Sequence, residues 1–78
     1  MTTIDILHAE NCRSFLRIGL YHARNYDWDR AIDALKAGIR AANRAHLPRA
    51  AGLTLVAIRR CQDARKRYAA MAPAVEVA

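Results

Sequence analysis

The side chains that could do chemistry in this chain are three histidines, two cysteines and a few carboxylates. His8 and Cys12 lie four residues apart, so on a helix they would share a face and could both bind a metal ion. A closed zinc site needs four such ligands, and no second pair with matching spacing follows. Asp29 and Asp33 are also one helical turn apart, but the helix dipole explains carboxylates near a helix start. The sequence therefore predicts no catalytic residue, no metal site and no cofactor.

The strongest remaining chemical feature is positive charge. The net charge is +6, and residues 34–78 carry about +7 while residues 1–33 carry about −1. The second half contains a dense group of cations, namely Arg59, Arg60, Arg65, Lys66 and Arg67. Such a group suits an acidic protein surface or a phosphate backbone, and it can equally be a solvated helix face. Aromatic residues do not alternate with these cations, which argues against single-stranded nucleic acid.

From this group we predict a set of partner-binding residues: Arg59, Arg60, Lys66, Arg67 and the neighbouring Val56. An acidic protein would need an apolar contact beside the arginines, because binding energy concentrates in desolvated anchors. Duplex DNA would instead be bound through phosphates, weakly and without sequence preference. Both kinds of partner use the same face.

Helices must hold these side chains, because helix-forming residues dominate and no stretch alternates apolar and polar residues for long. Seventy-eight residues allow one domain. We expect an all-α domain over residues 1–72 and a flexible tail over residues 73–78. Three helices are predicted, starting at residue 4 or 11 and ending at 24, then from 28 to about 45, and from about 48 to 71. Thr3 and Asp27 are the expected N-caps, and Pro73 is expected to end the third helix.

The core of such a domain would be thin. Seventeen residues are alanines, which pack helices closely and contribute little buried area. A chain this short buries only about 60% of the surface that its unfolded form exposes. We therefore expect a homodimer.

No run is apolar enough to cross a membrane and no signal peptide is visible, so two lone cysteines indicate a reducing, cytoplasmic location.

Residues 12–45 resemble one tetratricopeptide repeat (TPR), a pair of antiparallel helices with small and large residues at fixed places. The residues that carry the resemblance are Phe15, Ile18, Gly19, Trp28, Ala31, Leu35 and Gly38. Tyr26 stands where the family usually has glycine, and no second repeat is visible, so the third helix would act as a cap. The resemblance implies protein–protein interaction, with Phe15, Gly19, Trp28, Ala31 and Leu35 as structural residues. We expect Trp28 to pack near Phe15 and Gly19.

Residues 47–67 resemble a helix-turn-helix, with a short helix, a Gly-Leu-Thr turn and an arginine-rich second helix. In that arrangement Thr54 and Ala57 would face DNA, while Leu53 and Ile58 would point inward. Gly52 can equally lie inside one continuous helix, at a cost of about 1 kcal/mol.

The W-x-x-A start of the second helix and the run AIRRC also resemble small PerC- and ANR-type regulators of mobile elements. The sequence thus favours a non-enzymatic bacterial or phage regulator or adaptor that binds a protein through the hairpin face or the basic third helix. A DNA-binding regulator that uses residues 47–67 is the alternative.

Overall fold

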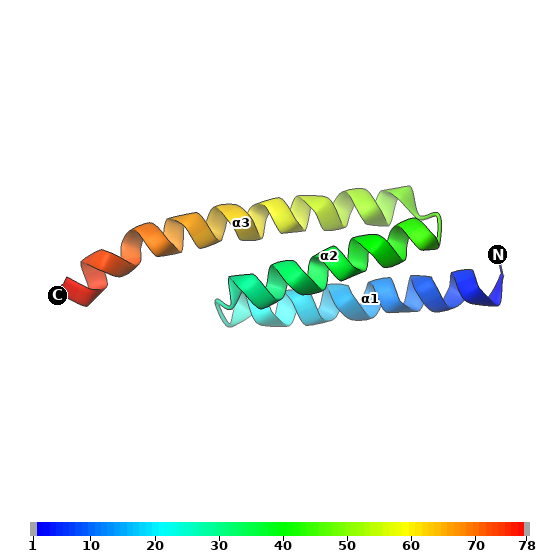
Figure 1. Ribbon diagram of the computed structural model, residues 1–78, viewed down its shortest axis with the longest axis horizontal. Coiled ribbons are helices and arrows are strands. Elements are labelled where there is room, and N and C mark those ends of the chain that lie inside the picture. Colours follow the sequence, from blue (N-terminus) through cyan, green and yellow to red (C-terminus); the bar gives the residue numbers. More distant parts are fainter. Residues whose placement is uncertain (1, 78) are drawn as a thin grey trace.

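The computed structural model describes residues 2–77, and for residues 72–77 it describes the backbone alone. Three α-helices follow one another: α1 Thr3–Arg24, α2 Trp28–Arg44 and α3 Pro48–Val77 (Figure 1). Residues 2–77 contain no strand, so the expected all-α, three-helix fold is confirmed. The middle helix α2 packs against both neighbours, whereas α1 and α3 scarcely touch each other. The result is an elongated molecule of 56 × 17 × 12 Å.

The starts of α1 and α2 are fixed by side-chain caps. At α1, the Thr2 hydroxyl accepts a hydrogen bond from the Asp5 backbone N–H (3.2 Å), and the Thr2 N–H donates to the Asp5 carboxylate (3.1 Å). The expected cap at Thr3 was wrong by one residue, because this reciprocal box needs a carboxylate three positions later and Thr3 has Ile6 there. At α2, Asp27 is the N-cap, as predicted, and accepts from the Arg30 N–H.

Both turns between helices close in the same way, through a Schellman motif. After α1, the Asp27 N–H donates to the His22 carbonyl (2.9 Å) and the Tyr26 N–H to the Ala23 carbonyl (3.1 Å). After α2, the N–H groups of Leu47 and His46 donate to the carbonyls of residues 42 and 43. The motif needs one residue in the left-handed region, and here Tyr26 (φ 60°) and His46 (φ 57°) adopt it. Tyr26 thus occupies a left-handed turn position that glycine fills most easily.

Small residues bring α1 and α2 together. A Cβ added to Gly19 would lie 2.8 Å from Leu35, so the leucine occupies the space that the glycine leaves. Ala31 and Leu35 are almost completely buried. Gly38 of α2 lies where all three helices meet, since a Cβ there would be 3.4 Å from the Phe15 Cβ and 3.7 Å from the Thr54 Cγ2.

Trp28 lies elsewhere than expected. It packs against the core cluster that contains Ala31, Ile32 and Cys61, and its indole ring makes an edge contact with Tyr26 at 5.9 Å. The residues beside Gly19 are Leu35 and Ala31, not Trp28. The antiparallel pairing explains this, because Trp28 begins α2 and therefore lies level with the last turn of α1.

The last part of α3 extends past the hairpin. Tyr68 stacks on Tyr26 (5.9 Å, 18°), and Arg65 forms an ion pair with Asp29 (2.7 Å), so these contacts lie at the end of the hairpin. Tyr68 and Met71 are exposed, because α2 offers them no further surface. The helix also continues through Pro73 to Val77 instead of ending there. A flexible tail was predicted for residues 73–78, whose side chains lie outside the described part of the chain.

Candidate partner-binding groove

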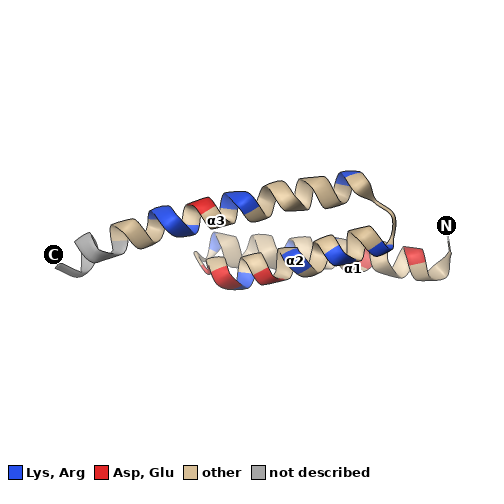
Figure 2. Ribbon diagram, turned by 45° about the horizontal axis from the view of Figure 1, so that its top comes forward, with Lys and Arg blue, Asp and Glu red and all other residues tan. Residues whose placement is uncertain are grey.

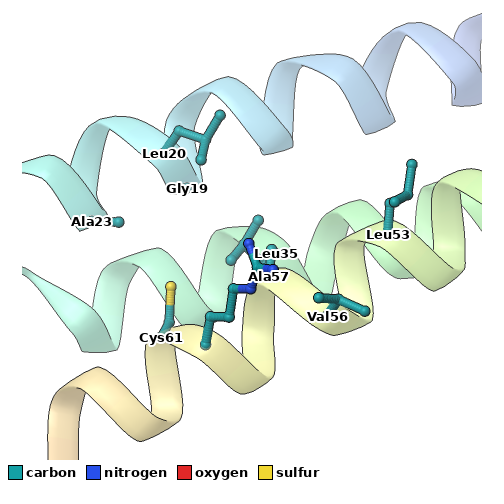
Figure 3. Close-up of a pocket in the computed structure, with 9 residues that line it drawn as sticks. Gly19, Leu20, Ala23, Leu35, Leu53, Val56, Ala57 and Cys61 are labelled. Atoms are coloured by element: carbon teal, nitrogen blue, oxygen red, sulfur yellow. The ribbon is translucent and has the colours of Figure 1, made fainter. Parts of the chain in front are cut away.

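A groove of about 310 Å³ runs between α1 and α3, with α2 beneath it. Its apolar lining comes from all three helices and includes Leu20, Ala23, Leu35, Leu53, Val56 and Ala57 (Figure 3). We call this the α1–α3 groove. It forms because α1 and α3 both pack on α2 and leave their facing sides uncovered. Leu53 is 72% exposed, and Leu20 and Val56 are also exposed, so the groove presents apolar surface to solvent.

The α1 side of the groove carries arginines. Arg17 and Arg24 lie three residues before and four residues after Leu20, so they share its side of the helix. Arg13 lies seven residues before Leu20, on the same side one turn further away. All three arginines are exposed. Glu10, the nearest acidic residue along α1, precedes Arg17 by seven residues and adds one carboxylate to this side.

The α3 side is also basic. Arg60 lines the groove directly. Arg49 precedes Leu53 by four residues and Arg67 follows Arg60 by seven, so both extend the same side of α3 in opposite directions. Asp63 follows Val56 by seven residues and Arg60 by three, so it adds one carboxylate to this side. Figure 2 shows the corresponding basic segments of α3 in blue.

No protein-family model, curated protein or solved structure matches this chain.

Over the described part of the chain, no three His, Cys, Asp or Glu side chains gather where they could hold a metal ion. None of the helices, over that same part, is long and apolar enough to cross a membrane. Cys12 and Cys61 are both buried, unbonded thiols, and burial raises the pKa of the Cys61 thiol above its ordinary value of 9.0.

The structure divides the predicted partner-binding residues. Val56 and Arg60 line the α1–α3 groove, and Arg67 lies on the Arg60 side of α3. Arg59 and Lys66 are exposed but lie about a quarter turn or more away from that side, because each residue advances a helix by about 100°. The group predicted as one patch therefore spreads over two sides of α3.

The geometry expected of a helix-turn-helix in residues 47–67 is absent. Residues 48–67 belong to one uninterrupted helix, and Gly52 lies inside it with nothing within 4 Å of an added Cβ. Thr54, expected to face DNA, is completely buried and donates its hydroxyl to the Ala50 carbonyl (2.7 Å). Leu53, expected to point inward, is exposed. Thr54 faces α2 because α3 packs along its length instead of folding back at Gly52.

Sequence reasoning missed part of the groove. Leu20 and the arginines of α1 were not singled out, since α1 and α3 are separated by the whole of α2 in the chain. Leu53 was expected to point inward as part of a helix-turn-helix. One signal was present: Leu20 is apolar but directly follows Gly19, so it lies about 100° round the helix from that predicted structural residue. An apolar residue that leaves the core stripe of a short helix marks surface available to another element.

Proposed function

We propose that this chain is a helical protein-interaction module of the cytoplasm, a regulator or adaptor, and that the α1–α3 groove receives its protein partner. The observation that carries the proposal is the groove itself, because it combines exposed Leu20, Leu53 and Val56 on two facing helices. Contiguous apolar surface with a polar rim is typical of interaction sites. Arg60 provides charge at the edge of that surface.

DNA binding remains the second candidate because α3 carries six of the 13 lysines and arginines. Without a recognition helix that projects from a turn, this charge supports phosphate contacts and not base recognition. Such binding would be weak at physiological salt. The protein-interaction proposal accounts for both the apolar and the basic residues, whereas DNA binding accounts for the basic ones alone.

The test is a comparison of two matched surface variants. Val56→Asp places a carboxylate in the groove, while Leu55→Asp places one on the adjacent residue of the same helix, outside the groove. Leu55 and Val56 are similarly exposed, at 42% and 46%. Each protein is immobilised and exposed to nuclease-treated lysate of its source cell. We expect a partner that wild type and Leu55→Asp retain and Val56→Asp loses. Equal retention by all three, or capture that ends with nuclease treatment, would contradict the proposal.

A further inference from the structure

The shape and charge of the α1–α3 groove point to a more specific partner. We propose that its occupant is an amphipathic α-helix of another protein, with an apolar stripe that enters the groove and acidic residues on both sides of that stripe. This inference rests on the proposed function, because it names the chemistry of the partner that the same site would bind.

The walls of the groove favour a helix over an extended segment. One common way to bind an extended segment is to add it as a strand to the open edge of a sheet, and residues 2–77 contain no strand. A helix satisfies its own backbone hydrogen bonds and presents only side chains. The facing walls are themselves two helices, so a fourth helix could lay its side-chain ridges between those of α1 and α3.

The length of the groove fits a few helical turns. The lining residues of α3 extend from Leu53 to Cys61. At a rise of 1.5 Å per residue, this span is about 12 Å, which is about two turns of a bound helix. Apolar residues at i, i+3, i+4 and i+7 would supply the anchors for Leu20, Leu53 and Val56.

The charge of both rims selects an acidic partner. Arg13, Arg17 and Arg24 are exposed on the Leu20 side of α1, and Arg60 lines the groove on α3. An occupant with carboxylates on both edges would therefore meet guanidinium groups on both edges. Guanidinium–carboxylate hydrogen bonds are charge-assisted and can be bidentate. A basic helix of the same shape would meet like charges, which disfavours it.

The experiment uses synthetic peptides of about 14 residues, or four turns, as probes of the full-length protein. The first has leucine at the anchor positions and glutamate beside them. The second replaces each glutamate with lysine, and the third keeps the acidic sequence but has proline at its centre. Fluorescence anisotropy of the labelled peptides gives each Kd. We expect the acidic helix to bind at least about tenfold more tightly than the lysine peptide, because of the rim charges. The proline peptide should also bind at least about tenfold more weakly, because it cannot form the helix.

Matched charge reversals locate the binding site. Arg60→Glu reverses a charge that lines the groove, and Arg59→Glu reverses the adjacent exposed charge outside it. Both variants have the same net charge, so they share any long-range electrostatic effect. We expect Arg60→Glu to weaken binding of the acidic peptide by at least about tenfold, and Arg59→Glu by much less. Leu53→Asp, at a residue that is 72% exposed, should abolish binding without unfolding the chain, as circular dichroism would verify.

The outcomes separate this inference from the proposed function. Equal affinity for the acidic and lysine peptides, or equal losses in Arg59→Glu and Arg60→Glu, would overturn the acidic-helix inference. If the cellular partner still depended on Val56 in that case, the protein-interaction proposal would survive with a different occupant. If neither the charge dependence of the peptides nor the dependence of the cellular partner on Val56 were observed, both the acidic-helix inference and the protein-interaction proposal would be wrong. Tighter binding of the proline peptide would show that the groove prefers an extended chain and would overturn the inference.

Discussion

At the scale of single residues, Gly19 and Gly52 have opposite roles. Gly19 lies against the Leu35 side chain, and a Cβ added to it would be 3.3 Å from the Ala31 carbonyl oxygen. Both a side chain and the backbone of α2 therefore limit its space. Gly52 lies in the interior of α3 with open space around it. The first glycine therefore allows close helix packing, whereas the second offers α3 no packing advantage and lowers its helix propensity.

We predict that Gly19→Ala destabilises the protein by about 1–3 kcal/mol, because the added methyl group overpacks a filled interface. Gly52→Ala is the matched control and should stabilise it by about 0.5–1 kcal/mol, because alanine is the better helix former. Urea unfolding followed by circular dichroism measures both changes. A neutral Gly19→Ala variant would show that α1 and α2 do not approach as closely as described.

Cys61 provides a pH-dependent prediction. Burial raises the pKa of its thiol because the folded chain disfavours the thiolate. The corresponding stability is fully present below the ordinary pKa of 9.0 and is lost as the pH rises through the higher pKa of the folded state. We expect the stability difference between wild type and Cys61→Ala to shrink above pH 9.0, as chemical unfolding at several pH values would measure. A difference that stays constant with pH would contradict the buried, neutral thiol.

At the scale of helices, the turns determine the antiparallel arrangement. Both Schellman motifs use a residue other than glycine at the left-handed position, namely Tyr26 and His46. Tyr26 gains contacts in return, because its ring meets Trp28 and stacks on Tyr68. His46 is exposed, and no aromatic contact of its ring accompanies the strained backbone among the described residues. The two turns should therefore respond differently to glycine.

We predict that His46→Gly stabilises the protein by about 1 kcal/mol, since the left-handed region costs a residue with a Cβ about 1–2 kcal/mol. Tyr26→Gly should give a smaller gain or a loss, because it also removes the two ring contacts. Thermal unfolding of the two variants under one buffer condition tests the pair. A larger gain at Tyr26 than at His46 would show that the stacked rings add no stability.

At the scale of the whole molecule, the chain is long and thin. Its radius of gyration is 14.8 Å, whereas a compact domain of this length would have about 11.5 Å. Exposed apolar residues also follow the side of α1 away from the groove: Ile4, Leu7, Ile18 and Tyr21. Ile18 and Leu20 are two residues apart, so they lie on nearly opposite sides of α1. The thin core and this second apolar stripe are the basis for expecting a homodimer.

We predict that the protein sediments at twice 8.7 kDa at micromolar concentration. Ile18→Glu should produce the monomer, because it places a charge in the apolar stripe of α1. Arg40→Glu, on the exposed side of α2, should leave the dimer intact. A single species of 8.7 kDa in the wild type would rule out the dimer.

The net charge of +6 leads to a separate prediction about nucleic acid. Duplex DNA should bind weakly and without sequence preference, and binding should be lost near physiological salt, because phosphate contacts release counterions. Gel shifts with two unrelated duplexes at low and physiological salt provide the measurement. A tight, sequence-selective complex at physiological salt would overturn the protein-interaction proposal.

The sequence alone was sufficient to predict the helical class and most helix boundaries. Local chemistry determines these features: Asp27 caps α2, Pro48 begins α3, and the spacing of Ala31, Ile32 and Leu35 gives α2 one buried side. Predictions from local sequence were wrong where the same residues suit two different local structures. Thr2 and Thr3 both suit an N-cap, and the position of Asp5 decides between them. Gly52 suits either a turn or a helix interior, and α3 adopts the helix because Thr54 and Ile58 pack against the hairpin.

Only the tertiary structure placed Leu20 opposite Leu53, Val56 and Arg60. Their positions depend on how α1 and α3 both pack on α2, and no periodicity within one helix contains that information. The same packing also decides that Arg60, and not its exposed neighbour Arg59, lines the groove. The sequence therefore determined which residues are apolar or basic, while the helix arrangement decided which of them share a groove, because a shared surface requires contacts between distant segments.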